Sequence, residues 1–136
     1  MFPNVKDGDF VVTWKLDEIQ TNDVVTYKDE DGTMTIGRVV AKSGDEVDFT
    51  DDGELKVNGS VTSEEVFYAA TIPSDSTITY PYTIPDGEYF ILNDYRSGDS
   101  NSYNDSRTYE SISKSDLNGK VILLIRRRGF WLCLKK

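Results

Sequence analysis

The chain has 136 residues, and no run of apolar residues in it is longer than five. Apolar and polar residues instead alternate over short segments, as in Val12, Trp14 and Leu16, which are separated by Thr13 and Lys15. Such alternation is typical of β-strands with one buried face. We therefore predict an all-β fold, with an antiparallel β-sheet core and a small β or irregular appendage.

Turn residues separate the predicted strands. Strands are expected at residues 24–27, 36–40, 47–49, 55–57, 88–92 and 121–126. The segments 36–40, 47–49 and 55–57 are bounded by Gly, Asp or Asn, and Asn58-Gly59 suits a tight turn. Residues 60–85 are rich in Ser, Thr, Tyr and Pro, residues 93–106 form a long polar loop, and a weak helical signal covers 113–117. The expected organisation is a single domain, residues 1–136, with a core of 1–59 and 86–136 and a minor lobe of 60–85.

Composition excludes several classes of function. The net charge of −9 argues against nucleic-acid binding, which requires a basic face, and runs of five apolar residues are too short to span a bilayer. The absence of histidine, with Cys133 as the single cysteine, excludes Ser-His-Asp and Cys-His catalysis and the usual zinc sites. The acidic clusters do not have the ligand spacing of a calcium loop, so neither a metal nor a cofactor is expected.

Charged residues suggest two local roles. Residues 120–136 carry six basic residues and no acidic one, which suits contact with an anionic membrane surface or pairing with the acidic remainder of the chain. Asp94, Arg96, Asp105 and Arg107 stand at the two ends of the polar loop. Carboxylate–guanidinium contacts between them would pin this loop.

Several short motifs follow one another in a recognisable order: Met1-Phe2-Pro3, Asn22-Asp23-Val24-Val25, Gly37-Arg38 leading to Gly44-Asp45-Glu46-Val47, Leu55-Lys56-Val57-Asn58-Gly59, Asn93-Asp94-Tyr95-Arg96, Asp105-Ser106-Arg107 and Gly119-Lys120. This order resembles the type I signal peptidases, and most of all the non-catalytic signal-peptidase-like accessory proteins of Gram-positive pilus operons. The resemblance covers nearly the whole chain. It implies a membrane-tethered fold built for a serine endopeptidase with a Ser/Lys dyad.

The resemblance also implies that the reactive residues are missing. The family's nucleophilic serine immediately precedes the methionine that matches Met1, so its position lies upstream of this chain. Gly37 stands at the position of the general-base lysine, and Tyr103 at that of the serine that orients this lysine. No catalytic residue is therefore expected to be intact. Lys42 or Lys28 could supply a base from elsewhere, but Lys42 is five strand positions, or about 17 Å, from Gly37.

The residues that match the family's scaffold are retained. Arg38 with Asp94, and Asp105 with Arg107, match its two structural ion pairs. Met1, Pro3 and Ile36 match positions that line its peptide-binding pockets. We therefore expect a cleft that can accept an extended peptide.

The resemblance gives three hypotheses for function. The first is a non-catalytic protein that assists pilus assembly by binding an extended segment of a pilin subunit or precursor. The alternative is an active type I signal peptidase that cleaves signal peptides from secreted precursors, and a third is a structural surface domain whose cleft is unused. In each case the expected location is the outer face of the cell membrane, held by a transmembrane anchor upstream of these residues.

Overall fold

The structure of the chain is a computed structural model that describes residues 5–6, 8–15, 18–62, 76–94, 105–126 and 131–132. Met1, Pro3 and Tyr103 lie outside these residues. The described parts of the chain contain no helix long and apolar enough to cross a membrane. Strands dominate, all of the ladders are antiparallel, and the predicted all-β fold is confirmed.

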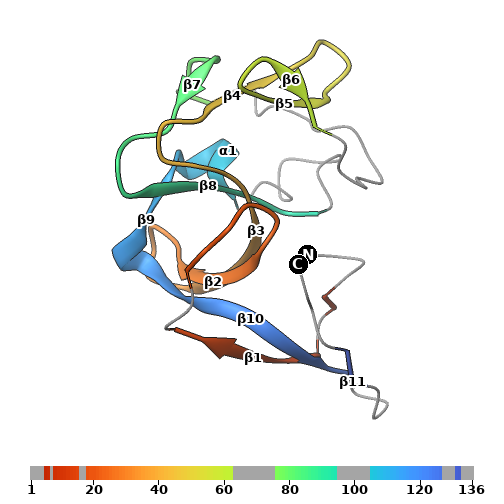
Figure 1. Cartoon of the computed structure of the whole chain (residues 1–136). Helices are drawn as coiled ribbons and strands as arrows, with labels where there is room; N and C mark the ends of the chain where they lie inside the picture. Colours follow the sequence, from red (N-terminus) through yellow and green to blue (C-terminus); the bar gives the residue numbers. More distant parts are fainter. Residues whose placement is uncertain are drawn as a thin grey trace.

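The larger sheet forms the lower part of the molecule in Figure 1. Its strands run in the order β1-β10-β2-β3-β8-β9, and β11 pairs with the end of β10. Strands β2, β3 and β8 contain the longest runs of buried residues. The strands are β1 (Phe10–Trp14), β2 (Val24–Lys28), β3 (Met34–Lys42), β8 (Glu88–Leu92), β9 (Ile112–Ser113), β10 (Leu117–Ile125) and β11 (Trp131–Leu132).

The smaller sheet lies above the larger one in Figure 1 and has the order β6-β5-β4-β7. Its strands are β4 (Glu46–Phe49), β5 (Leu55–Val57), β6 (Ser60–Val61) and β7 (Tyr82–Thr83). Strands β4 and β5, which the sequence analysis placed in the core, pair within this smaller sheet, and their residues Val47 and Leu55 are buried in a core cluster. Their alternation is the same in either sheet, so the sequence pattern does not reveal which partners a strand takes.

Two hydrophobic clusters pack on either side of β3. A register shift between Val39 and Ala41 in the β3–β8 ladder lets neighbouring residues of β3 enter the same cluster. One cluster joins the two sheets and contains Val40, Ala41, Val47, Leu55, Ile84, Phe90 and Leu92. The other lies on the opposite face and contains Ile19, Val25, Tyr27, Val39, Ile91 and Ile112. Contact between β3 and β8 thus contributes to both clusters.

Short helical pieces connect the later strands. The 3₁₀ turn η2 (Lys114–Asp116) falls within the weak helical signal at 113–117. The one-turn helix α1 (Ser106–Tyr109) had no counterpart in the sequence prediction, which placed this segment at the end of a loop. The side chain of Asp105 caps α1 by accepting a hydrogen bond from the N–H of Arg107, which is the usual role of aspartate at this position.

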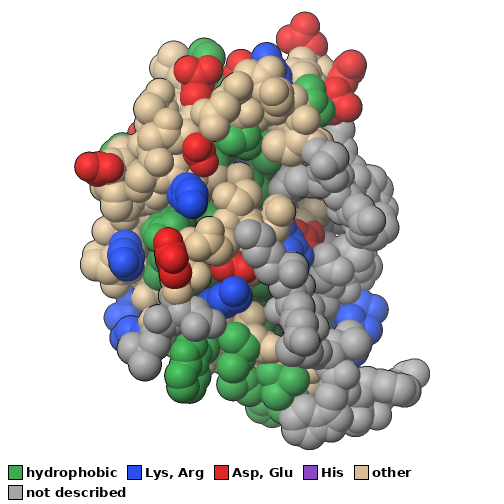
Figure 2. Space-filling view, in the orientation of Figure 1, with side chains coloured by type: hydrophobic (Ala, Val, Ile, Leu, Met, Phe, Trp, Pro, Cys, Tyr) green, Lys and Arg blue, Asp and Glu red, His purple; other side chains and the backbone are tan. Residues whose placement is uncertain are grey.

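Strand β1 at the edge of the larger sheet exposes apolar side chains. Phe10, Val12 and Trp14 are 72%, 40% and 49% exposed, and they alternate along one face of the strand. Figure 2 shows apolar side chains gathered over β1 at the lower edge of the molecule. A row of this kind on the surface of a protein often marks contact with another apolar surface.

Candidate functional site

Arg38 joins three segments that are far apart in the sequence. Its Nε and Nη2 atoms donate to Oδ1 and Oδ2 of Asp94, at 2.8 and 3.1 Å, and its Nη1 donates to the carbonyl oxygen of Asn22 at 2.8 Å. The side chains of Arg38 and Asp94 are 24% and 9% exposed. The structure thus brings together the first ion pair expected from the sequence, with the two-point geometry that a guanidinium offers a carboxylate.

The Asn22-Asp23 segment is tied to β3 by its backbone. The N–H of Asn22 donates to the carbonyl of Val39 at 2.7 Å, and the N–H of Val39 donates to the carbonyl of Asp23 at 2.9 Å. Asn22 has a φ of 75°, in the left-handed region that asparagine tolerates better than most residues. Asn22 can therefore occupy this turn position without a glycine.

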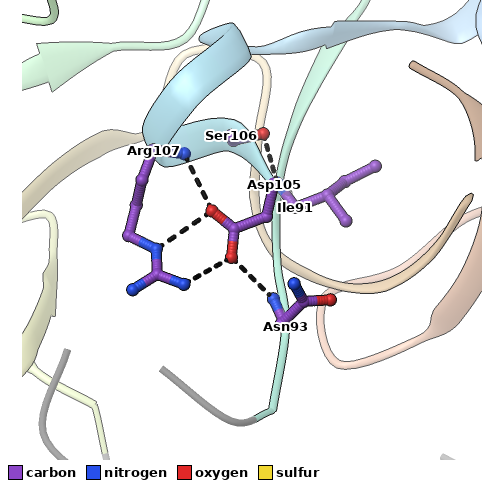
Figure 3. Close-up of polar contacts among 5 residues, drawn as sticks. All are labelled: Ile91, Asn93, Asp105, Ser106 and Arg107. Atoms are coloured by element: carbon purple, nitrogen blue, oxygen red, sulfur yellow. Dashed lines mark hydrogen bonds and ion pairs between the residues drawn. The ribbon is translucent and has the colours of Figure 1, made fainter. Parts of the chain in front are cut away.

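A second ion pair is completely buried beside this frame. Arg107 donates from Nε and Nη2 to Oδ1 and Oδ2 of Asp105, at 3.0 and 2.7 Å, and both side chains are 0% exposed. Figure 3 shows the Asp105 carboxylate between Arg107 on one side and the N–H of Asn93, at 3.0 Å, on the other. This is the second expected pair, and it ties the end of β8 to the start of α1.

A third ion pair was not foreseen from the sequence. The Nζ atom of Lys120 on β10 lies 3.2 Å from Oδ1 of Asp23, whose other oxygen accepts the N–H of Gln20 at 2.8 Å. Both charged residues belong to motifs that the sequence analysis singled out. Their place in two separate motifs was the only indication in the sequence that these residues matter. It did not pair them, because the contact depends on β10 lying beside β2.

Gly37 lies in the buried middle of β3, opposite Val25 of β2. A Cβ atom at this position would overlap Cγ2 of Ile91 and would lie 3.3 Å from Cε1 of Tyr27. The position that matches the general base is therefore occupied by backbone alone, with apolar side chains packed around it. The sequence identified the glycine but gave no indication of this crowding.

The remaining predicted site residues are only partly within the described chain. Ile36 is half-buried on β3 and lies opposite Thr26, and among the described strands Ile36 and Gly37 pair with β2 alone, because the ladder to β8 ends at Arg38. The lining positions Met1 and Pro3, and the matched position Tyr103, are not described. Of the three positions expected to line the cleft, the structure therefore describes Ile36 alone.

Buried tyrosines are the perturbed titratable groups of this region. Burial raises the pKa of Tyr27, and the negative charge of Asp105 adds to the effect. Burial likewise raises the pKa of Tyr80, whose hydroxyl has no hydrogen-bond partner among the described residues. Both phenols therefore stay neutral at physiological pH, and neither is suited to act as a base.

The described residues offer no metal centre. No group of three or more His, Cys, Asp or Glu side chains among them could hold an ion. A hollow of about 360 Å³ lies beside β3 and the smaller sheet, and the described residues that line it are uncharged: Thr21, Asn22, Val40, Val57, Ser60, Val61 and Thr62. The ion pairs and the crowded Gly37 are thus the distinctive features of the candidate site.

Comparison with known proteins agrees with these motifs. Residues 1–125 match the family model described as signal peptidase, peptidase S26, so the chain belongs to the signal peptidase family. A signal peptidase I from Enterococcus faecalis V583 has a similar structure, with a TM-score of 0.57 and 23% identity over 76% of this chain and 97% of that one. At this identity, the likeness shows a signal peptidase I-like fold. No curated protein matches the chain significantly.

Proposed function

We propose that this protein is a non-catalytic member of the signal peptidase family that holds an extended peptide instead of cutting it. The observation that carries this proposal is Gly37, which stands where the resemblance implies a lysine base. A serine hydroxyl is a poor nucleophile until an adjacent base removes its proton. With no side chain at position 37, the family's dyad has no base.

Two other lysines, Lys42 and Lys28, are the candidate substitute bases. Lys42 lies at one end of β3, opposite Tyr89, and Lys28 lies at the end of β2, opposite Met34. Both are exposed. A base must come within hydrogen-bond reach of its nucleophile, whereas Lys42 is about 17 Å along the strand from Gly37. Neither position favours a replacement for the missing amine.

The retained scaffold supports a role in binding. The pairs Arg38–Asp94 and Asp105–Arg107 hold the frame around the site at 2.8 and 2.7 Å. Ile36 matches a pocket-lining position and lies on the part of β3 that no described strand other than β2 pairs with. An extended peptide could add to such a strand through main-chain hydrogen bonds and place side chains in adjacent pockets.

The partner that we propose is an extended segment of a pilin subunit or its precursor, and the proposed role is assistance in pilus assembly. The support is the resemblance to the accessory proteins of Gram-positive pilus operons. We place the protein at the outer face of the cell membrane, held by an upstream anchor. The exposed apolar side chains of β1, together with the basic residues at 126–128 and 135–136, favour a position close to a lipid surface.

An active type I signal peptidase is the alternative, and family membership is equally compatible with it. That function would require a serine immediately upstream of Met1 and a base other than residue 37. A direct test uses the protein extended with its native upstream residues and anchor, incubated with a precursor that carries an A-x-A cleavage site. Turnover that disappears when the residue before Met1 is replaced would contradict the non-catalytic proposal.

Peptide binding is measured by fluorescence anisotropy with a synthetic extended peptide that spans the A-x-A cleavage site. We expect the peptide to bind without being cleaved, and Ile36→Ala to weaken binding about tenfold, which is the loss expected when a buried apolar contact of roughly 1.4 kcal/mol is removed. Val61→Ala, on the other sheet, is the matched control and should bind normally. Equal affinity in all three proteins would argue against a cleft at Ile36.

A further inference from the structure

Gly37 has no room for a side chain. A Cβ atom there would overlap the Cγ2 methyl group of Ile91, and it would lie 3.3 Å from Cε1 of Tyr27 and 3.5 Å from the carbonyl oxygen of Leu92. Protein interiors are close-packed, and an added methyl group is accommodated only when a neighbour moves. Whether any residue other than glycine fits at position 37 therefore depends on Ile91.

Ile91 is held in place from several directions. Its side chain is completely buried within the cluster that contains Val39 and Ile112. Its N–H donates to Oγ of Ser106 at 2.9 Å, as Figure 3 shows, and it is paired with Val39 in the β3–β8 ladder. Isoleucine is also branched at Cβ, which restricts rotation about χ1. Neither the backbone nor the side chain can readily withdraw the Cγ2 methyl group.

Tyr27 closes the other side of the same space. It is completely buried on β2, where it lies opposite Thr35 and packs in the same cluster as Ile91. The space beside Gly37 is therefore already occupied by a ring and a methyl group. A lysine side chain directed into it would also bring an ammonium group among apolar side chains, at a large cost in desolvation.

We propose that Ile91 is a second determinant of this site: its Cγ2 methyl group fills the volume that a side chain at position 37 needs, so that residues 37 and 91 form a matched pair. The meaning of this pair for catalysis rests on the proposed function. A single Gly37→Lys substitution does not return an amine to the site, because residue 91 has to change with it. The steric coupling between the two positions exists whether or not the protein is an enzyme.

The coupling is measured with a double-mutant cycle on this chain. Gly37→Ala, Ile91→Ala and the double variant are compared with the unmodified protein by denaturant unfolding. In the presence of Ile91, we expect Gly37→Ala to reduce the folding equilibrium constant. In the Ile91→Ala background, the factor by which Gly37→Ala reduces this constant should be at least about tenfold smaller. Equal losses in the two backgrounds would overturn the proposal.

Two further variants show whether the effect is specific to the Cγ2 methyl group of Ile91. Ile91→Leu retains the side-chain volume but has no Cγ2 methyl group, so it should relieve Gly37→Ala even if Ile91→Ala does not fold. Gly119→Ala is the matched control for a crowded strand glycine, because its Cβ would meet the backbone of Trp14 and Cβ of Thr13 instead of Ile91. The loss of stability caused by Gly119→Ala should be the same with isoleucine or leucine at position 91. A relief at position 119 of the same size would show a general loosening of the sheet and would contradict a specific pair.

Activity separates this inference from the proposed function. In the extended protein with serine before Met1, we expect cleavage of the A-x-A precursor only when Gly37→Lys is combined with Ile91→Leu. Cleavage by Gly37→Lys alone would overturn the matched pair and leave the non-catalytic proposal intact. Turnover by the unmodified protein would overturn the non-catalytic proposal and leave the measured coupling intact.

Discussion

Lys120 and Asp23, from opposite ends of the chain, form an ion pair with Nζ and Oδ1 3.2 Å apart. The Asp23 side chain is 1% exposed, whereas that of Lys120 is 19% exposed. No described hydrogen bond reaches Oδ1 of Asp23, so the ammonium group is the charge that compensates it. The pair fastens the turn before β2 to β10, and the stability of this part of the sheet should depend on it.

Lys120→Met should therefore destabilise the protein by about 3 kcal/mol, because it leaves a buried carboxylate without its partner. The free energy of unfolding is measured by urea titration. Lys42→Met is the control, since Lys42 is exposed and its replacement should change stability by less than about 0.5 kcal/mol. Equal losses for the two variants would mean that the Asp23 contact contributes nothing specific.

Replacing Asp105 should have a larger effect. Asp105→Ala removes the carboxylate that pairs with the buried Arg107 guanidinium, the acceptor for Asn93 N–H and the cap of α1 in one step. We expect a loss of about 4 kcal/mol in the free energy of unfolding. Asp86→Ala, in an exposed turn, is the control. A loss of less than about 1 kcal/mol for Asp105→Ala would show that the buried pair is dispensable.

Alkaline conditions should unfold the protein through its buried tyrosines. Burial raises the pKa of Tyr27 and of Tyr80 above the usual value near 10. The folded state then keeps protons that the unfolded state releases, so stability is fully present below pH 10 and falls as the pH rises above it. Absorbance at 295 nm and circular dichroism should show these phenols ionising together with unfolding. In Tyr80→Phe, less of the stability should be lost between pH 10 and 12; an unchanged alkaline slope would contradict the role of Tyr80.

The apolar side chains of β1 should bind lipid. Phe10→Ser combined with Trp14→Ser should reduce sedimentation with vesicles of phosphatidylglycerol and phosphatidylcholine at least about threefold, because exposed apolar area contributes to such binding. Met34→Ser and Val61→Ser, which replace exposed apolar residues on other strands, are the controls. If all variants sediment equally, β1 does not face the membrane.

Strand positions were largely predictable from the sequence, because alternation and turn residues act locally. Residues 55–57 and 88–92 were predicted with the bounds that β5 and β8 have in the structure. The membership of β4 and β5 in the smaller sheet was not predictable, because it is decided by partners that only the folded chain brings together. Helix α1 was missed because its signal is a single capping residue, Asp105.

The features of the candidate site that were predictable are those that depend only on which residue stands at each position. The motifs placed Gly37 at the base position and suggested that Arg38 meets Asp94, and the structure brings these two side chains together. They gave no indication that Ile91 crowds Gly37, because that contact crosses from β3 to β8 and depends on the register between them. The link from Lys120 to Asp23 was missed for the same reason.

The carboxylate of Asp105 accepts hydrogen bonds from the N–H of Asn93 and from the N–H of Arg107, and so holds both borders of the intervening segment. One carboxylate therefore makes the end of β8 and the start of α1 a single cooperative unit. Opening of α1 should release the amide of Asn93 at the same time, so that hydrogen exchange at Asn93 and at Arg107 should report the same opening free energy.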